Sequence, residues 1–298
     1  MAENNNPNKI NPKQIFFTFL TVICAAGFLI CAVIMIRDYK IQKEAEKQFE
    51  ELAQNVIVTE APTEAVIEIE TETETEAPSI IEERGIEIPQ MALDWSNLVS
   101  QNDDIYSWIY IPNTKVNYPV LQHETEHDFY LDHNLDKSEG RPGCIYTQRY
   151  NTTTYMDRNT VLYGHNMKNG SMFKTLHSFE DEAFFNENRY IYIYTPSSVL
   201  VYEIIAACEY SNEHVLYKYD FNTEEAVGEF IEDLAKGNAS KNHVLDTLSF
   251  NPDTKIVTLS TCIAGRATER FLVVGQLLGE EAMDYEALLA ASTEAAGE

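Results

Sequence analysis

KIVTLSTCIAGRATERFLVVGQLL, residues 255–278, is the stretch that decides the fold of this chain. Its first segment, Lys255–Thr261, and its last, Phe271–Val274, are rich in β-branched residues, which predicts two strands. Between them Ile263–Glu269 forms a short loop that contains Gly265. We therefore expect an antiparallel hairpin closed by this loop.

The expected hairpin gives two reactive residues a common place at the end of a strand. Cys262 lies opposite Arg270, and directly opposed residues in an antiparallel pair project from the same face of the sheet. A neighbouring guanidinium favours the thiolate, which is the nucleophilic form of cysteine, and it can stabilise an oxyanion on an attacked acyl group. The alternative interpretation, a small buried cysteine and a solvated arginine, stays open on these residues alone.

Composition narrows the class of protein. The 298 residues carry a formal net charge of -27, with 48 acidic against 21 basic side chains. Contact with nucleic-acid phosphates needs clustered Lys and Arg, and the sequence has no such cluster, so we expect no nucleic-acid partner. The 17 Tyr and 14 Phe suit a β-rich domain.

The five cysteines make a poor disulfide framework. Cys24 and Cys31 lie in an apolar segment, which leaves three for the folded part. A bridge between Cys144 and Cys208 would leave Cys262 free, but the sequence does not establish it. No CxxC motif is present, so zinc-ribbon and thioredoxin-like interpretations lack their basic pattern.

An apolar segment near the N-terminus, residues 15–36, reads IFFTFLTVICAAGFLICAVIMI and has 22 residues without a charge. This length predicts a transmembrane helix that follows a cytoplasmic N-terminus at residues 1–14. A cleaved signal peptide is the alternative, but its apolar region is usually shorter and ends at a small-residue cleavage site. Because Arg37 follows here instead, we favour an uncleaved anchor.

Residues 37–89 are predicted to form a charged, acidic stalk. Tyr39–Leu52 could extend the helix beyond the membrane. Val56–Glu83 is low in complexity, with EIETETETEAP at its centre, and its self-repulsion and lack of a packable face predict an extended, disordered segment.

Residues 90–280 are predicted to form one folded domain, followed by a C-terminal tail at 281–298 that adds little. Many short strands separated by turn signals argue for a mostly β, closed or nearly closed barrel. A short helix over Leu93–Gln101 and an amphipathic helix over Asn222–Lys236 interrupt them. The predicted strands before the hairpin are Ile105–Ile111, Val116–Leu121, Gly143–Thr147, Thr160–Tyr163, Tyr190–Thr195 and Val199–Tyr210.

One histidine stands at the end of a predicted strand. Asn159–Gly170 reads NTVLYGHNMKNG, so His165 follows the strand and can reach a site on the sheet. Its near-neutral pKa suits general acid and base work, and with Cys262 it would make a Cys/His nucleophile system. A lone surface histidine is the alternative. The other four, His133, His177, His214 and His243, have no ligand-like spacing and are interpreted as structural or exposed.

A second histidine pattern, His123-Glu124-Thr125-Glu126-His127, fits the HExxH motif of zinc peptidases. That chemistry needs both histidines on one face of a helix. The motif here follows a predicted strand that contains Pro119, so we favour a solvated loop. No GxGxxG or P-loop pattern is present, and we expect neither a metal nor another cofactor.

Several ordered motifs resemble those of the class B sortases, over about Leu93 to Leu278. The resemblance lies in TLSTC at Thr258–Cys262 with Arg270-Phe271, in NTVLYGHNM at Asn159–Met167 with its continuation to Phe179, and in Trp108–Pro112, Tyr118–Val120 and Tyr130–Asn134. It implies an eight-stranded sortase-type β-barrel with an N-terminal helix and an extra helix before the last two strands. The extra helix matches Asn222–Lys236.

The resemblance also implies a reaction and its residues. Such enzymes of Gram-positive bacteria are transpeptidases that cleave a C-terminal sorting signal, NPxTN-like or related, and join the protein to an amine. By correspondence, Cys262 is the nucleophile that forms a thioacyl intermediate, His165 the acid and then the base, and Arg270 the holder of the substrate carbonyl. Ser260 and Thr261 are candidates for substrate contact. Arg266, the competing arginine, sits at the loop tip, where the hairpin points it away from Cys262.

The family implies partners and an orientation as well. The partners are surface proteins with a sorting signal, an acceptor amine on a peptidoglycan precursor or a pilin, and the cell membrane. The catalytic domain is expected outside the cell on a single-pass anchor. The positive-inside rule does not favour this orientation, because the basic residues after the span outnumber those before it, namely Arg37, Lys40, Lys43 and Lys47 against Lys9 and Lys13.

Two other interpretations use the same residues. A thiol hydrolase would cleave without transfer, and a surface protein with an inactive barrel would do neither. The intact set of Cys262, His165 and Arg270 argues against the inactive barrel.

Overall fold

The computed structural model describes residues 12–55, 58–59, 79–237, 241–246 and 248–295. The chain divides into two compact units, residues 1–44 and 45–298. The first unit contains most of helix α1 (Pro12–Asn55), which is long and apolar enough to cross a membrane. The predicted N-terminal segment 1–14 and the predicted stalk lie partly outside the described residues, at 1–11, 56–57 and 60–78.

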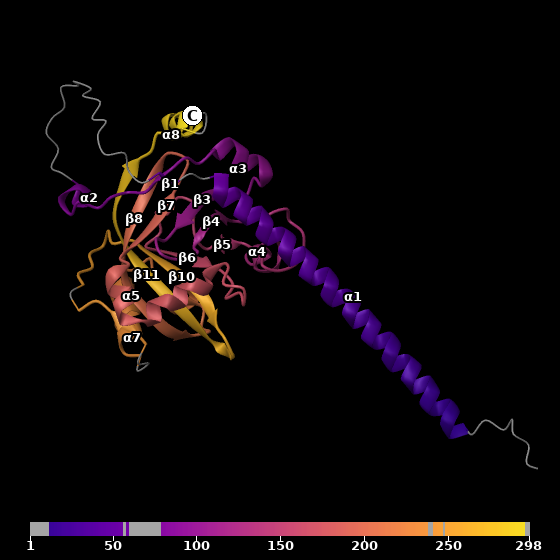
Figure 1. The fold of residues 1–298 in the computed structure, drawn as a ribbon. Coiled ribbons are helices and arrows are strands. Elements are labelled where there is room, and N and C mark those ends of the chain that lie inside the picture. Colours follow the sequence, from indigo (N-terminus) through magenta and orange to yellow (C-terminus); the bar gives the residue numbers. More distant parts are fainter. Residues whose placement is uncertain (1–11, 56–57, 60–78, 238–240, 247, 296–298) are drawn as a thin grey trace, which may run out of the picture. The chain divides into compact units, whose positions relative to one another are not determined.

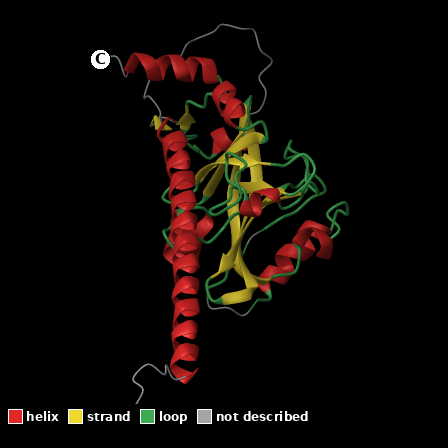
Figure 2. Cartoon of the chain, turned by 90° about the vertical axis from the view of Figure 1, so that its right-hand side faces the viewer, coloured by secondary structure: helices red, strands yellow, loops and turns green. Residues whose placement is uncertain are grey.

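The second unit is a closed β-barrel (Figures 1 and 2). Its eight strands are hydrogen-bonded in the cyclic order β11-β10-β6-β5-β4-β3-β7-β8, and the pairing of β11 with β8 closes the ring. This confirms the predicted mostly β fold. The strands of the barrel are β3 (Ile105–Tyr110), β4 (Asn117–Leu121), β5 (Ile145–Thr147), β6 (Asn159–Tyr163), β7 (Tyr190–Tyr194), β8 (Ser198–Ser211), β10 (Ile256–Ile263) and β11 (Arg266–Ala282). Strand β9 (His243–Val244) adds to the edge of β8, and β1 (Val58–Thr59) pairs with β2 (Gln90–Met91).

Short helices fill the connections between the strands. The N-terminal helix of the domain, α3, begins after Asp94, whose carboxylate accepts from the Asn97 backbone N–H and so caps the first turn. The helix predicted before the last two strands is α7. The helices of this unit are α2 (Ile80–Glu83), α3 (Trp95–Gln101), α4 (Phe129–Asp132), the 3-10 helix η1 (Phe173–Glu180), α5 (Glu182–Glu187), α6 (Val215–Lys218), α7 (Ala226–Ala235) and α8 (Tyr285–Ala295).

Side chains alternate between the two faces of the hairpin strands, as a period of two requires. Phe271 and Val273 join the large core cluster inside the barrel. Leu272 and Val274 join a second cluster, which contains Phe230 and the other apolar residues of α7. The amphipathic α7 therefore covers the outer face of the barrel and not its interior.

The C-terminal part differs from the expectation of a tail that adds little. Strand β11 continues to Ala282, well past the predicted end, and α8 follows it. Tyr285 is 7% exposed, its ring packs edge-on against Trp95 at 5.6 Å, and its hydroxyl donates to the Ser198 carbonyl. Tyr285 thus packs the C-terminal segment against α3, a contact that the composition of this segment did not reveal.

Candidate active site

The hairpin has the predicted register. Cys262 pairs with Arg270 across β10 and β11, and the register shifts directly afterwards, between Cys262 and Ile263. The turn uses Gly265 at a φ of +78°, a left-handed conformation that glycine adopts without steric cost. Cys262 is exposed, whereas its neighbour Thr261 is 2% exposed.

A parallel pairing brings His165 to the same end of β10. Strand β6 runs parallel to β10 up to the pair Ser260–Tyr163, and the chain then continues through Gly164 to His165. Two further bonds join the strand ends: the Gly164 N–H donates to the Ser260 carbonyl at 3.2 Å, and the Thr261 hydroxyl donates to the Gly164 carbonyl at 2.8 Å. The Thr261 side chain therefore links the ends of β6 and β10, and it also lines the cavity that contains Cys262.

The imidazole of His165 is half-buried and held by a backbone oxygen. Its Nε2 lies 2.7 Å from the Leu131 carbonyl, which can only accept, so Nε2 carries the hydrogen. Burial lowers the pKa of His165 by more than the hydrogen bond to Leu131 raises it, and the charges of Arg141 and Asp132 add smaller effects in opposite directions. The neutral ring is thus favoured, with Nδ1 as the nitrogen that takes up a proton.

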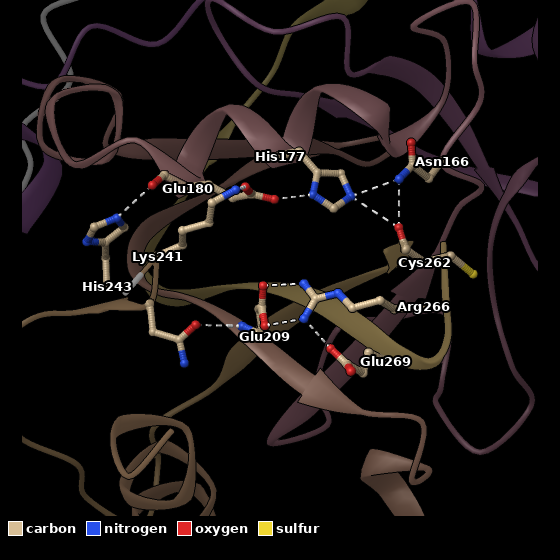
Figure 3. Close-up of polar contacts among 10 residues, drawn as sticks. Asn166, His177, Glu180, Glu209, Lys241, His243, Cys262, Arg266 and Glu269 are labelled. Atoms are coloured by element: carbon tan, nitrogen blue, oxygen red, sulfur yellow. Dashed lines mark hydrogen bonds and ion pairs between the residues drawn. The ribbon is translucent and has the colours of Figure 1, made fainter. Parts of the chain in front are cut away.

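The two arginines near the start of β11 have different surroundings. Arg270 donates from Nη1 to the carbonyls of Ala267, at 3.1 Å, and Glu269, at 3.0 Å. Arg266 forms ion pairs with Glu209 and with Glu269, and so is engaged away from Cys262 (Figure 3). The hydrogen bonds that Arg266 donates to Glu209 raise the pKa of Arg266. Arg270 is the guanidinium that shares a cavity with the thiol.

One cavity of about 230 Å³ contains all three predicted catalytic side chains. It lies on the outward side of the hairpin, because Leu272, which faces α7, also lines it. The other lining residues are Asp128, Leu131, Tyr146, Tyr163, Gly164, His165, Tyr210, Asn212, Glu213, His214, Val215, Ser260, Thr261, Cys262 and Arg270. Both predicted substrate-contact residues, Ser260 and Thr261, are among them.

Two histidines that the sequence left as structural or exposed lie at this site. His214 lines the cavity, and its Nε2 donates to the Gln148 amide oxygen at 2.6 Å. His177 lies behind the nucleophile, where its Nε2 is 3.1 Å from the Cys262 carbonyl oxygen. His177 lies within the motif that continues to Phe179, but that motif gave no sign of its contact with Cys262, and no motif surrounds His214.

The HExxH segment forms a loop between β4 and α4 and not a helix. His123 stacks on Phe129 at 4.0 Å, and its Nδ1 accepts from the backbone N–H groups of Thr125 and Glu126. His127 stacks instead on Tyr150, at 4.1 Å. The two imidazoles are thus held by different partners, and the residues that the structure describes contain no group of three or more side chains placed to hold a metal ion.

A thiol, an imidazole and a guanidinium in one groove of a closed β-barrel define a cysteine enzyme of the acyl-transfer class. A family profile described as "Sortase domain" matches residues 109–278, more than half of the chain. The chain therefore belongs to the sortase family, whose members are cysteine transpeptidases.

Its relatives place it among the class B sortases. It is 28% identical to sortase B of Listeria monocytogenes over 184 residues, covering 61% of this chain and 73% of the relative. It is 26% identical to sortase B of Staphylococcus aureus over 186 residues, covering 62% and 74%. The structure of Clostridium perfringens sortase B gives a TM-score of 0.55 at 28% identity, over 62% of this chain and 99% of that one.

Proposed function

We propose that this transpeptidase cleaves a C-terminal sorting signal, NPxTN-like or related, and joins the protein to an amine of the cell wall or of a pilin. The observation that carries the proposal is the register of the hairpin, which sets Cys262 and Arg270 side by side in the cavity that His165 also lines. Helix α1, which is long and apolar enough to cross a membrane, supports an enzyme that acts as a membrane-anchored protein.

The first half of the reaction forms the acyl-enzyme. The sulfur of Cys262 attacks the scissile carbonyl carbon, so a C–S bond forms and the C–N bond of the signal breaks. The proton of the Cys262 thiol passes to His165, which then gives it to the departing amine, and Arg270 stabilises the oxyanion. Arg270 gives up its bonds to the Ala267 and Glu269 carbonyls to do so, and the Ala267 carbonyl, whose bond is exposed, can bond water instead.

The second half of the reaction transfers the acyl group. An incoming amine attacks the thioester, a C–N bond forms and the C–S bond breaks, and His165 takes the proton from the amine. Water is the competing nucleophile. A membrane anchor raises the effective concentration of anchored substrates and wall amines, which favours transfer over hydrolysis.

The test uses the full chain in detergent micelles with a library of sorting-signal peptides, with and without an added primary amine. We expect an amide-linked product from the wild type and none from Cys262→Ala. Product that consists of the free acid alone at saturating amine would identify a thiol hydrolase. Cleavage by Cys262→Ala at the wild-type rate would contradict the proposed mechanism.

A further inference from the structure

Two side chains contact the carbonyl oxygen of Cys262 on the side of the residue opposite its sulfur. The Asn166 amide Nδ2 donates to this oxygen at 2.8 Å, and His177 Nε2 lies 3.1 Å from it. The two contacting nitrogens are 3.0 Å apart. Figure 3 shows the sulfur directed away from both side chains. We call Asn166, His177 and Glu180 the carbonyl clamp.

Glu180 and Phe271 hold the ring of His177 in place. His177 Nδ1 donates to Glu180 Oε1 at 2.6 Å, and the two side chains are only 13% and 18% exposed. The ring also stacks on Phe271 of β11, with centroids 5.0 Å apart. Burial raises the pKa of Glu180, but bonds from Lys241 and His177 lower it by more, so the carboxylate stays ionised.

The Cys262 carbonyl keeps a hydrogen bond in both protonation states of the His177 ring. A carboxylate only accepts, so Nδ1 of His177 carries a hydrogen. In the neutral ring, Nε2 accepts the second N–H of Asn166, which fixes the amide that bonds Cys262. In the charged ring, Nε2 itself donates to the Cys262 carbonyl. The carbonyl is bonded in either case.

The clamp stands where the regular strand pairing is interrupted. The parallel ladder of β6 and β10 stops at Ser260, and the partner on β11 changes from Arg270 at Cys262 to Arg266 at Ile263. The peptide that follows the nucleophile therefore lies at an irregularity of the sheet, where a side-chain contact can help to fix it. Asn166 is the direct neighbour of His165, so its bond to Cys262 ties the segment that carries the imidazole to the residue that carries the thiol.

We propose that the carbonyl clamp positions the thiol of Cys262 relative to His165, with His177 and Glu180 as positioning residues. The inference rests on the proposed role of Cys262 as nucleophile. A misplacement of about 1 Å at a reacting centre can cost on the order of 10²-fold in rate. The groove side chains that meet the substrate are untouched by the clamp, so its loss acts on kcat and not on KM.

The experiment compares His177→Phe with a matched control, His243→Phe, in the full-length enzyme. His177→Phe keeps a ring against Phe271 and removes both nitrogens. The ring of His243 also stacks on a phenylalanine, Phe185. Its Nε2 lies 3.1 Å from the backbone carbonyl oxygen of Glu180, and His243 has no hydrogen bond to Cys262. His177→Gln puts an amide nitrogen near the place of Nε2, and serves as the conservative variant.

We expect His177→Phe to lower kcat for peptide transfer at least about tenfold with KM within about twofold of the wild type. His177→Gln should recover part of this loss, and His243→Phe should match the wild type. The pH profile of Cys262 alkylation by iodoacetamide, which needs no substrate, should shift in His177→Phe alone. If the wild-type enzyme transfers no peptide, the proposed function is wrong. The alkylation profile needs no substrate, so it would still test the clamp.

Three results would overturn the clamp: an unchanged kcat in His177→Phe, an equal loss in His243→Phe, or an alkylation profile that superimposes on the wild type. If His177→Phe fails to fold, Asn166→Leu replaces it and is judged by the same three results. Thermal unfolding of each variant separates lost stability from lost positioning.

Discussion

At the scale of the residue, the folded domain exposes one of its three thiols and buries the other two. Cys144 and Cys208 are 1% and 0% exposed, and no disulfide joins them. Burial raises the pKa of both thiols, that of Cys208 to about 12. Cys262 has the same chemistry at a strand end, but it is exposed in a groove beside a guanidinium. The three thiols should therefore differ in reactivity because only Cys262 is exposed.

Alkylation should report this difference directly. Brief treatment of the folded protein with iodoacetamide should label Cys262 and leave Cys144 and Cys208 unlabelled, because only thiolates at accessible sites react. Peptide mass spectrometry measures the extent at each site, and denatured protein, labelled at all three, is the control. Label on Cys208 at a rate similar to that on Cys262 would contradict the structure.

The two arginines near the start of β11, Arg266 and Arg270, offer a second residue-scale test. Arg270→Ala should lower kcat/KM by about 10²–10³-fold, because removing one donor to an oxyanion has an effect of this size. Arg266→Ala is the matched control, since Arg266 is engaged by Glu209 and Glu269, and it should stay within about threefold of the wild type. Steady-state kinetics on a sorting peptide measure both. The reverse order of the two effects would reassign the oxyanion donor.

The two cavity histidines predict how stability depends on pH. Burial lowers the pKa of His165 and of His214, so the unfolded chain, with a histidine pKa of about 6.5, binds protons that the folded protein does not. Stability should therefore fall as the pH drops below about 6.5. The thermal midpoint should drop less between about pH 7.5 and 5.5 in the double variant His165→Gln/His214→Gln than in the wild type. Equal drops would show that these groups are not involved.

At the scale of the element, a glycine sets how closely β6 approaches its neighbours before the chain reaches His165. A Cβ added at Gly164 would lie 2.5 Å from Ile145 Cδ1 and 2.7 Å from Phe173 Cδ2. Phe173 is fully buried, and its N–H donates to the His165 carbonyl at 3.0 Å. The strand end, the start of η1 and the imidazole thus form one packed unit.

Gly164→Ala should therefore destabilise the fold by about 1–3 kcal/mol, as overpacking does, and should lower activity because it displaces His165. Gly228→Ala in α7 is the control. Its Cβ would meet Phe250 only at 3.9 Å, and alanine in a helix is favoured over glycine by about 0.5–1 kcal/mol. Urea unfolding gives both free energies. An unaffected Gly164→Ala would mean that Phe173 can move without cost.

At the scale of the whole molecule, the apolar stretch of the N-terminal helix matches a membrane in length. Its 22 uncharged residues, 15–36, span about 33 Å at 1.5 Å per residue, close to the hydrocarbon thickness of about 30 Å. The apolar side chains of this stretch, such as Phe28 and Met35, are exposed in the structure, as a lipid-facing helix requires. The helix is thus long and apolar enough to anchor the protein in a bilayer.

Exposed Cys262 can serve as a probe of orientation. If the catalytic domain is outside, a membrane-impermeant maleimide should label Cys262 on intact protoplasts, and Cys262→Ala should lose that label. A variant without residues 1–37 should no longer sediment with membranes after alkaline washing. Label that appears only after lysis would place the domain in the cytoplasm, as the basic residues after the span would suggest.

The sequence by itself determined the features that depend on neighbours along the chain. The β-branched residues of the two hairpin strands and the 22 uncharged residues each specify an element locally, and so the Cys262–Arg270 pairing was predictable. The predicted loop 263–269 is shorter in the structure, because pairing resumes between Ile263 and Arg266. The place of His165 beside Cys262 followed from family resemblance, and its physical cause, the parallel pairing of β6 with β10, appears only in the fold. The contacts of His177, His214 and Tyr285 were decided by tertiary structure alone. Each joins segments far apart in sequence, and local periodicity carries no information about which distant segments meet when a barrel closes.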